Sequence, residues 1–146
     1  MKAEIGVGKA DASMLRRLCA IDEAVIGDDS RRGLIKDAIN GYQCLYAKIG
    51  DVFVGFAIFE QSFFGQGFID LLIVHPDYRQ QGVGKAIIAY IEDHCPTDKL
   101  FTSTNQSNIP MQNLCEGIGF SRSGYIENLD EGDPEIIYFK RIKFED

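Results

Sequence analysis

The sequence is short of the patterns that metal sites need. Four cysteines lie far apart, without a C-x-x-C pair and without a histidine at ligand spacing: Cys19, Cys44, Cys95 and Cys115. This spacing argues against a zinc site, so we expect no bound metal. Unpaired thiols also favour a reducing compartment, and we expect a cytoplasmic protein.

Long apolar runs and an excess of positive charge are also missing. No apolar run approaches the roughly 18 residues of a membrane-spanning helix, and residues 1–5 show no apolar signal segment. Fifteen basic residues stand against 22 acidic ones, which gives a net charge of −7. We therefore expect neither a membrane nor a nucleic acid as the partner.

No repeat, low-complexity tract or linker divides the 146 residues. Hydrophobic residues make up 45% and charged residues 25%, as in ordinary globular proteins. A chain of this length buries about 70% of its unfolded surface, enough for a core without disulfides. The sequence predicts a single domain over residues 1–146.

The first third predicts one strand and two helices. A short strand is expected at about 3–8. Asp11 is placed to cap a helix whose apolar residues, from Met14 to Val25, recur at helical spacing. Ser30 is placed to cap a second helix, which Gly41 ends.

The remaining chain alternates strands with helices and predicts a mixed α/β fold. Strands are expected at 43–49, 52–60, 68–74, 99–104, 120–126 and 136–142, and helices from Gly82 to before Pro96 and at 108–118. The first two of these strands form a hairpin around Gly50-Asp51, and the third is a buried strand that contains Asp70.

The turn between the buried strand and the next helix has the sequence RQQGVGK, from Arg79 to Lys85. Unpaired N–H groups at the start of a helix bind phosphate, and glycines let it approach closely. An ordinary glycine turn is the alternative. A dinucleotide-binding G-x-G-x-x-G lacks its last glycine, because Ile87 stands there, and a P-loop fails at Arg79 and Ala86.

Two segments resemble the GNAT superfamily of N-acetyltransferases. The stretch from Val74 to Gly84, VHPDYRQQGVG, resembles its acetyl-CoA signature, Gln or Arg followed by x-x-Gly-x-Gly or Ala. The stretch from Asn108 to Phe120 resembles its Asn-x-x-Ala-x-x-Leu-Tyr-x-x-x-Gly-Phe segment. The resemblance covers nearly the whole chain.

The resemblance implies a mostly antiparallel sheet of six or seven strands, with helices on both faces and a splay between strands 4 and 5. It also implies acetyl-CoA as the acetyl donor. By position, Asn108 would contact the pantetheine arm or cap its helix, and the backbone of Ile73 and Val74 would pair with the arm. The pyrophosphate would lie on Arg79, Gln80, Gln81, Gly82, Val83, Gly84 and Lys85.

Acetyl transfer from acetyl-CoA to an amine needs a base for the amine and an acid for the CoA thiolate. Deprotonating an alkyl amine at pH 7 costs roughly 4–5 kcal/mol. Asp70 matches the acidic residue proposed as the base in polyamine-acetylating relatives; holding the ammonium group or a purely structural role is the alternative. Cys115 replaces the tyrosine that protonates the CoA thiolate in many relatives. Cys115 is then a weak acid or a packing residue. Either Tyr125, Tyr138 or water is the acid instead, or the acid step is unimportant.

The sequence leaves the acceptor open between a small-molecule amine and a peptide amine. Five carboxylates in residues 127–135 favour a cationic acceptor, whereas arginines at 16, 17, 31 and 32 favour an anionic group; a solvated loop is the alternative for the carboxylates. Phe63 and Phe64 are expected in a loop that lines the acceptor pocket or covers the sheet edge. The resemblance also admits a homodimer, since relatives are often dimers. The alternative functions are a non-catalytic acyl-CoA-binding module on the same fold and a protein-interaction domain whose glycine turn is incidental.

Overall fold

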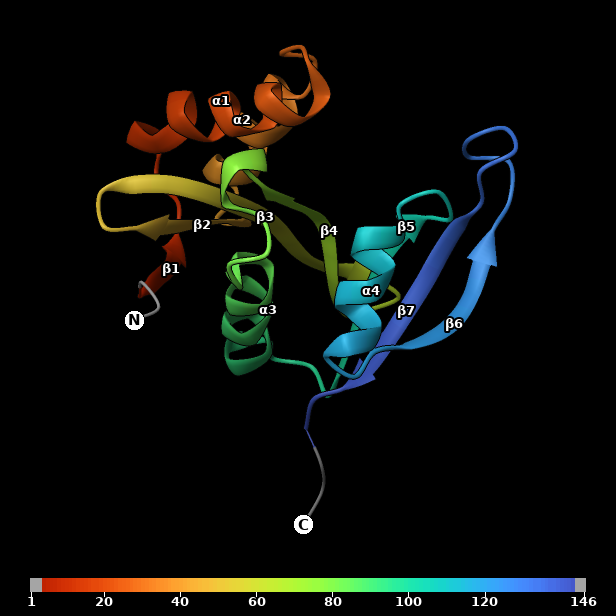
Figure 1. The fold of residues 1–146 in the computed structure, drawn as a ribbon. Helices are drawn as coiled ribbons and strands as arrows, with labels where there is room; N and C mark the ends of the chain where they lie inside the picture. The colour runs from red at the N-terminus through yellow and green to blue at the C-terminus, as the bar shows by residue number, and fades with distance from the viewer. Residues whose placement is uncertain (1–3, 144–146) are drawn as a thin grey trace. The chain divides into compact units, whose positions relative to one another are not determined.

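The computed structural model describes residues 4–143, and these contain a seven-stranded sheet in the order β1-β2-β3-β4-β5-β7-β6 (Figure 1). The strands are β1 (Ile5–Lys9), β2 (Cys44–Ile49), β3 (Val52–Phe63), β4 (Gln66–Val74), β5 (Lys99–Asn105), β6 (Ser121–Ile126) and β7 (Glu135–Arg141). The helices are η1 (Ala12–Met14), α1 (Leu15–Ile26), α2 (Arg32–Asn40), η2 (Pro76–Tyr78), α3 (Val83–His94) and α4 (Ile109–Gly117). The predicted mixed α/β class with a mostly antiparallel sheet is confirmed.

The chain divides into two compact units. The first comprises Met1–Phe59 and Leu71–Asp93, and the second comprises Glu60–Asp70 and His94–Asp146. Strands β3 and β4 each supply residues to both units. The single domain expected over residues 1–146 stays a prediction.

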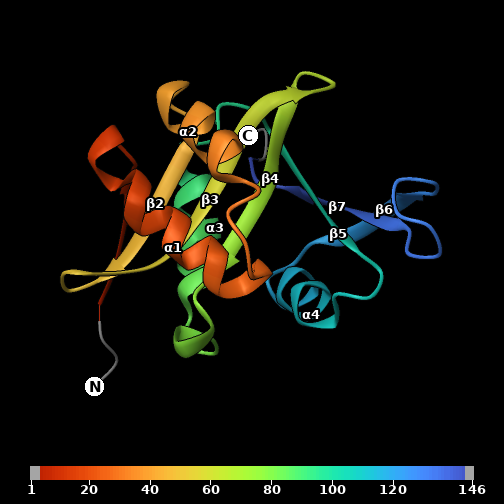
Figure 2. The same ribbon diagram turned by 90° about the horizontal axis from the view of Figure 1, so that it is seen from above.

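In the first unit, helices cover both faces of β2 and β3. Figure 2 shows α1 and α2 on one side of these strands and α3 on the other. Phe56 and Ile58 belong to the core formed with α1 and α2, while the neighbouring Gly55 faces α3. The β2–β3 register shifts where Ala47 pairs with Gly55 and Lys48 with Phe53. Val54 is therefore an extra residue, a β-bulge.

In the second unit, β5 has a parallel neighbour on one side and an antiparallel neighbour on the other. Its parallel pairing with β4 covers Gly67–Ile69. Its pairing with β7 covers all of Lys99–Asn105. At the sheet edge, β6 exposes all six residues, and its register with β7 shifts at Gly124, which has a φ of +121°.

Two local predictions are wrong. Ser30 does not cap α2; its backbone N–H donates to Asp28, and the helix begins after Arg31, whose Nε donates to the buried Asp22 at 3.0 Å. Phe63 is not in a loop but ends β3, where it stacks on Phe68 with ring centroids 4.6 Å apart. A favourable aromatic contact therefore extends β3 beyond the predicted strand.

Candidate functional site

Two residues of the turn between β4 and α3 have the backbone conformation that glycine favours. Gln80 and Gly82 both adopt left-handed conformations, with φ of +63° and +86°. The carbonyl oxygen of Gly82 accepts a hydrogen bond from Ala86 N at 2.9 Å, so Gly82 caps α3. A glycine is favoured at this φ because other residues are strained there.

The first N–H groups of α3 are available to a ligand. Within residues 4–143, the backbone nitrogens of Val83, Gly84 and Lys85 donate to no protein acceptor, as expected for the first turn of a helix. A Cβ at Gly82 would meet no atom within 4 Å, so the approach to the turn is open. The helix dipole adds about 0.3–1 kcal/mol for an anion placed there. This turn fits a pyrophosphate.

Asp70 is the only charged residue of β4. The sequence predicts a buried strand, but only alternate positions such as Ile69 and Ile73 are buried, and the Asp70 side chain is exposed. Partial desolvation and the nearby Glu60 carboxylate raise the pKa of Asp70 above its usual value. A raised pKa makes this carboxylate a better proton acceptor than an ordinary aspartate.

Asn108 caps α4, the structural role expected for it. Its Oδ1 accepts a hydrogen bond from Met111 N at 3.2 Å. Among residues 4–143, its Nδ2 has no hydrogen-bond partner, so the amide keeps two donors for a ligand. The same side chain is therefore able both to cap α4 and to donate to a ligand.

Cys115 lies in the interior of the second unit. It is fully buried on α4, and burial, followed by the Glu116 carboxylate, raises the pKa of its thiol to about 12. Such a thiol holds its proton and does not face solvent. Its surroundings support the packing interpretation.

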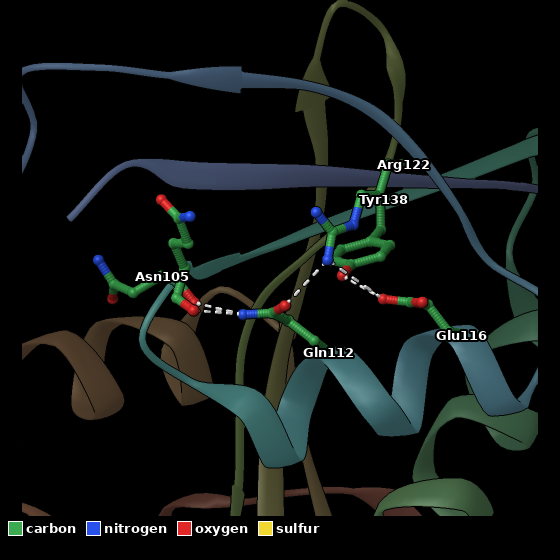
Figure 3. Close-up of polar contacts among 6 residues, drawn as sticks. Asn105, Gln112, Glu116, Arg122 and Tyr138 are labelled. Atoms are coloured by element: carbon green, nitrogen blue, oxygen red, sulfur yellow. Dashed lines mark hydrogen bonds and ion pairs between the residues drawn. The ribbon is translucent and has the colours of Figure 1, made fainter.

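The two tyrosines considered as acids have different environments. Tyr138 is fully buried on β7, and its hydroxyl donates to Glu116 Oε2 at 2.9 Å. Glu116 also forms an ion pair with Arg122 at 3.6 Å, and Arg122 in turn donates to Gln112 Oε1 (Figure 3). Tyr125 on β6 is 66% exposed. Only the Tyr125 hydroxyl is therefore free of this network.

The loop of residues 127–135, which carries five carboxylates, makes contacts that the sequence did not predict. Asp133 accepts hydrogen bonds from Ser107 N at 2.9 Å and Ser107 Oγ at 2.6 Å, and Asp130 accepts one from Asn105 Nδ2 at 2.8 Å. These contacts hold the turn before α4. Residues 127–135 are thus partly structural, and no fixed spacing in the sequence could have paired them with this turn.

The structure separates the predicted site residues into two groups. Ile73, Val74 and the turn residues 79–85 belong to the first unit. Asp70, Asn108, Cys115 and Tyr125 belong to the second, and within the described residues no hydrogen bond or ion pair joins any two of them. In the same part of the chain, no cluster of His, Cys, Asp or Glu is placed to hold a metal ion. No helix among residues 4–143 is long and apolar enough to cross a membrane.

Comparison with known proteins identifies one family. The sequence model of the acetyltransferase (GNAT) family matches residues 15–120. A crystal structure of a GNAT-family acetyltransferase from Bacillus cereus ATCC 10987 is 42% identical, with a TM-score of 0.91, over 94% of this chain and 97% of that one. Among curated proteins, no sequence matches this chain.

More distant solved structures share the fold. The ribosomal-protein-S18-alanine N-acetyltransferase from Escherichia coli is 17% identical, with a TM-score of 0.84, over 98% of this chain and 97% of that one. The yncA protein from Salmonella typhimurium, solved with its cofactor acetyl-CoA, is 12% identical, with a TM-score of 0.75, over 97% and 95%. At these identities the likeness concerns the fold alone.

Proposed function

Because the chain belongs to the GNAT family of acetyltransferases, we propose that it transfers the acetyl group of acetyl-CoA to a primary amine of a small molecule or peptide. The observation that carries the proposal is the turn before α3, with its left-handed Gly82 and the free N–H groups of Val83, Gly84 and Lys85. Acetyl-CoA, when bound, supplies the acetyl group as a thioester.

The turn residues have a binding role in this proposal. The backbone from Gln80 to Lys85 holds the pyrophosphate, with Arg79 at the entrance of the turn. The backbone of Ile73 and Val74 pairs with the pantetheine arm and polarises the acetyl carbonyl; one such donor typically contributes about 3–4 kcal/mol. The free amide donors of Asn108 contact the same arm.

The proton transfers have separate candidates. Asp70 accepts the proton of the amine or holds the ammonium group, and its raised pKa supports the first role. Tyr125 or water protonates the CoA thiolate, because the Tyr138 hydroxyl is bonded to Glu116 and the Cys115 thiol is buried.

A calorimetric titration with acetyl-CoA tests the proposal. We expect micromolar affinity that is lost in G82A, since the methyl group disfavours the left-handed turn. G27A is a matched control: Gly27 has a φ of +85° with open space around it and ends α1. Both variants should lose about 1 kcal/mol of stability, and only G82A should lose affinity. Absence of wild-type binding at millimolar acetyl-CoA would overturn the proposal.

A non-catalytic acyl-CoA-binding module is the second candidate, and the buried Cys115 favours it. It predicts acetyl-CoA binding without thiol release for any amine. An assay of thiol release over polyamines, aminoglycosides, amino acids and peptides separates the two functions and identifies the acceptor.

The proposed compartment is the cytoplasm, since all four cysteines are free. Sedimentation would test for a homodimer.

A further inference from the structure

Gly55 occupies a position on β3 that has no room for a side chain. A Cβ there would lie 2.9 Å from the carbonyl oxygen of Ile73, 3.0 Å from Val83 Cγ1 and 3.5 Å from Ile87 Cδ1. Its φ lies outside the left-handed region, so space alone requires glycine here. The carbon–oxygen contact at 2.9 Å and the carbon–carbon contact at 3.0 Å are both shorter than ordinary van der Waals contacts, so neither can be kept.

The three neighbours of Gly55 come from two elements that we assign to acetyl-CoA. Ile73 lies near the end of β4, Val83 is the first residue of α3, and Ile87 follows one turn later. The side chains of Val83 and Ile87 are fully buried, so neither can turn aside into solvent. Gly55 thus packs closely against both the end of β4 and the start of α3.

The neighbouring bulge fixes the same region of β4. The carbonyl oxygen of Val54, the bulged residue, accepts a hydrogen bond from His75 N at 2.8 Å, directly after β4. The strand end is therefore held by a hydrogen bond at Val54 and by close packing at Gly55. A methyl group at Gly55 therefore forces a shift of β3 relative to the backbone of Ile73 and to helix α3.

We infer that Gly55 is a positioning residue for acetyl-CoA: its missing side chain sets the spacing between the backbone at Ile73 and the first turn of α3. The inference rests on the proposed function. Restoring ordinary contacts after a Gly55→Ala change needs a shift of about 0.5 Å. Hydrogen bonds weaken steeply with distance and angle, so such a shift impairs simultaneous contact with pantetheine and pyrophosphate.

The test compares G55A with G6A by calorimetric titration with acetyl-CoA at 10 °C, where both proteins are first shown to be folded by circular dichroism. Gly6 is a strand glycine of the same unit, and a Cβ there would meet only ordinary contacts at 3.9 and 4.0 Å. We expect G55A to bind at least tenfold more weakly and G6A to bind as wild type does. Equal affinities of G55A and wild type would overturn the inference and leave the proposed function standing. An absence of wild-type binding would overturn both.

A second variant separates positioning from lost stability. G55A/V83A removes the Cγ1 atom that a methyl group at Gly55 would strike, while the backbone N–H of residue 83 stays. We expect it to bind acetyl-CoA more tightly than G55A although its Tm is lower. An affinity and a Tm that fall together would contradict positioning.

If G55A does not fold, V83I inserts bulk into the same contact from the helix side. A tenfold loss of affinity in V83I supports the inference, and unchanged affinity overturns it.

Discussion

At the scale of single residues, Asp70 combines an exposed side chain with a raised pKa. If it is the base, D70N should lower kcat at pH 7 by about 100-fold, the lower end of the range for general base catalysis. The measurement is thiol release at saturating acetyl-CoA and amine. Unchanged turnover in D70N would show that Asp70 does not accept the proton of the amine.

The Glu60 carboxylate provides the control for Asp70. E60Q removes a charge that raises the pKa of Asp70, so the acidic limb of the pH–rate profile should move to lower pH while turnover at pH 7 persists. A folded-state pKa above the unfolded value means that stability falls as pH rises through that pKa. D70N and E60Q should therefore both raise Tm at pH 7.

Phenylalanine variants distinguish the roles of Tyr125 and Tyr138. Y138F removes a buried hydrogen bond to Glu116 and should cost about 1 kcal/mol of unfolding free energy, with turnover kept. Y125F changes an exposed side chain and should leave stability unchanged. If Tyr125 protonates the thiolate, kcat of Y125F should fall by about 100-fold. Full turnover in Y125F would assign that step to water.

At the scale of elements, the sequence predicts the strands and helices well because apolar spacing and turn residues mark them. Gly50 does adopt a left-handed conformation in the predicted hairpin turn, and Gly41 does end α2. The start of α2 was missed because a tertiary contact, Arg31 with the buried Asp22, fixes it instead of the local cap at Ser30.

The candidate site was predicted only where it is local in sequence. The turn from Arg79 to Lys85 follows from a strand, a glycine and a helix in succession. Gly55 was missed because its role depends on atoms of Ile73 and Val83, far along the chain. The contacts of Asp133 with Ser107 were missed for the same reason, since 26 residues separate them.

Helix α4 allows the two roles of Asn108 to be separated. N108D keeps an oxygen that caps Met111 N, whereas N108A removes it and should cost about 1 kcal/mol of unfolding free energy. If the free amide donors also contact the pantetheine arm, both variants should bind acetyl-CoA more weakly. Urea unfolding and calorimetric titration measure the two effects. Wild-type affinity in N108D would restrict Asn108 to capping.

At the scale of the whole molecule, the two compact units raise the question of cooperativity. Strands β3 and β4 each contribute residues to both units. When one unit unfolds, the other therefore keeps only part of each strand. We therefore expect one calorimetric transition for residues 1–146, with an enthalpy of roughly 100 kcal/mol near 60 °C and an equal van't Hoff enthalpy. Two transitions, or a clearly smaller van't Hoff enthalpy, would contradict a single domain.

The irregular edge strand β6 also bears on strand pairing between copies of the protein. An exposed edge offers unpaired N–H and C=O groups to any extended chain nearby. The register shift between Arg122 and Tyr125, with Gly124 at a φ of +121°, interrupts that row after a few residues. A bulged edge is a poor template for a further strand. The bulge in β6 thus protects the protein against growth into strand-linked aggregates, even though every residue of this strand is open to solvent.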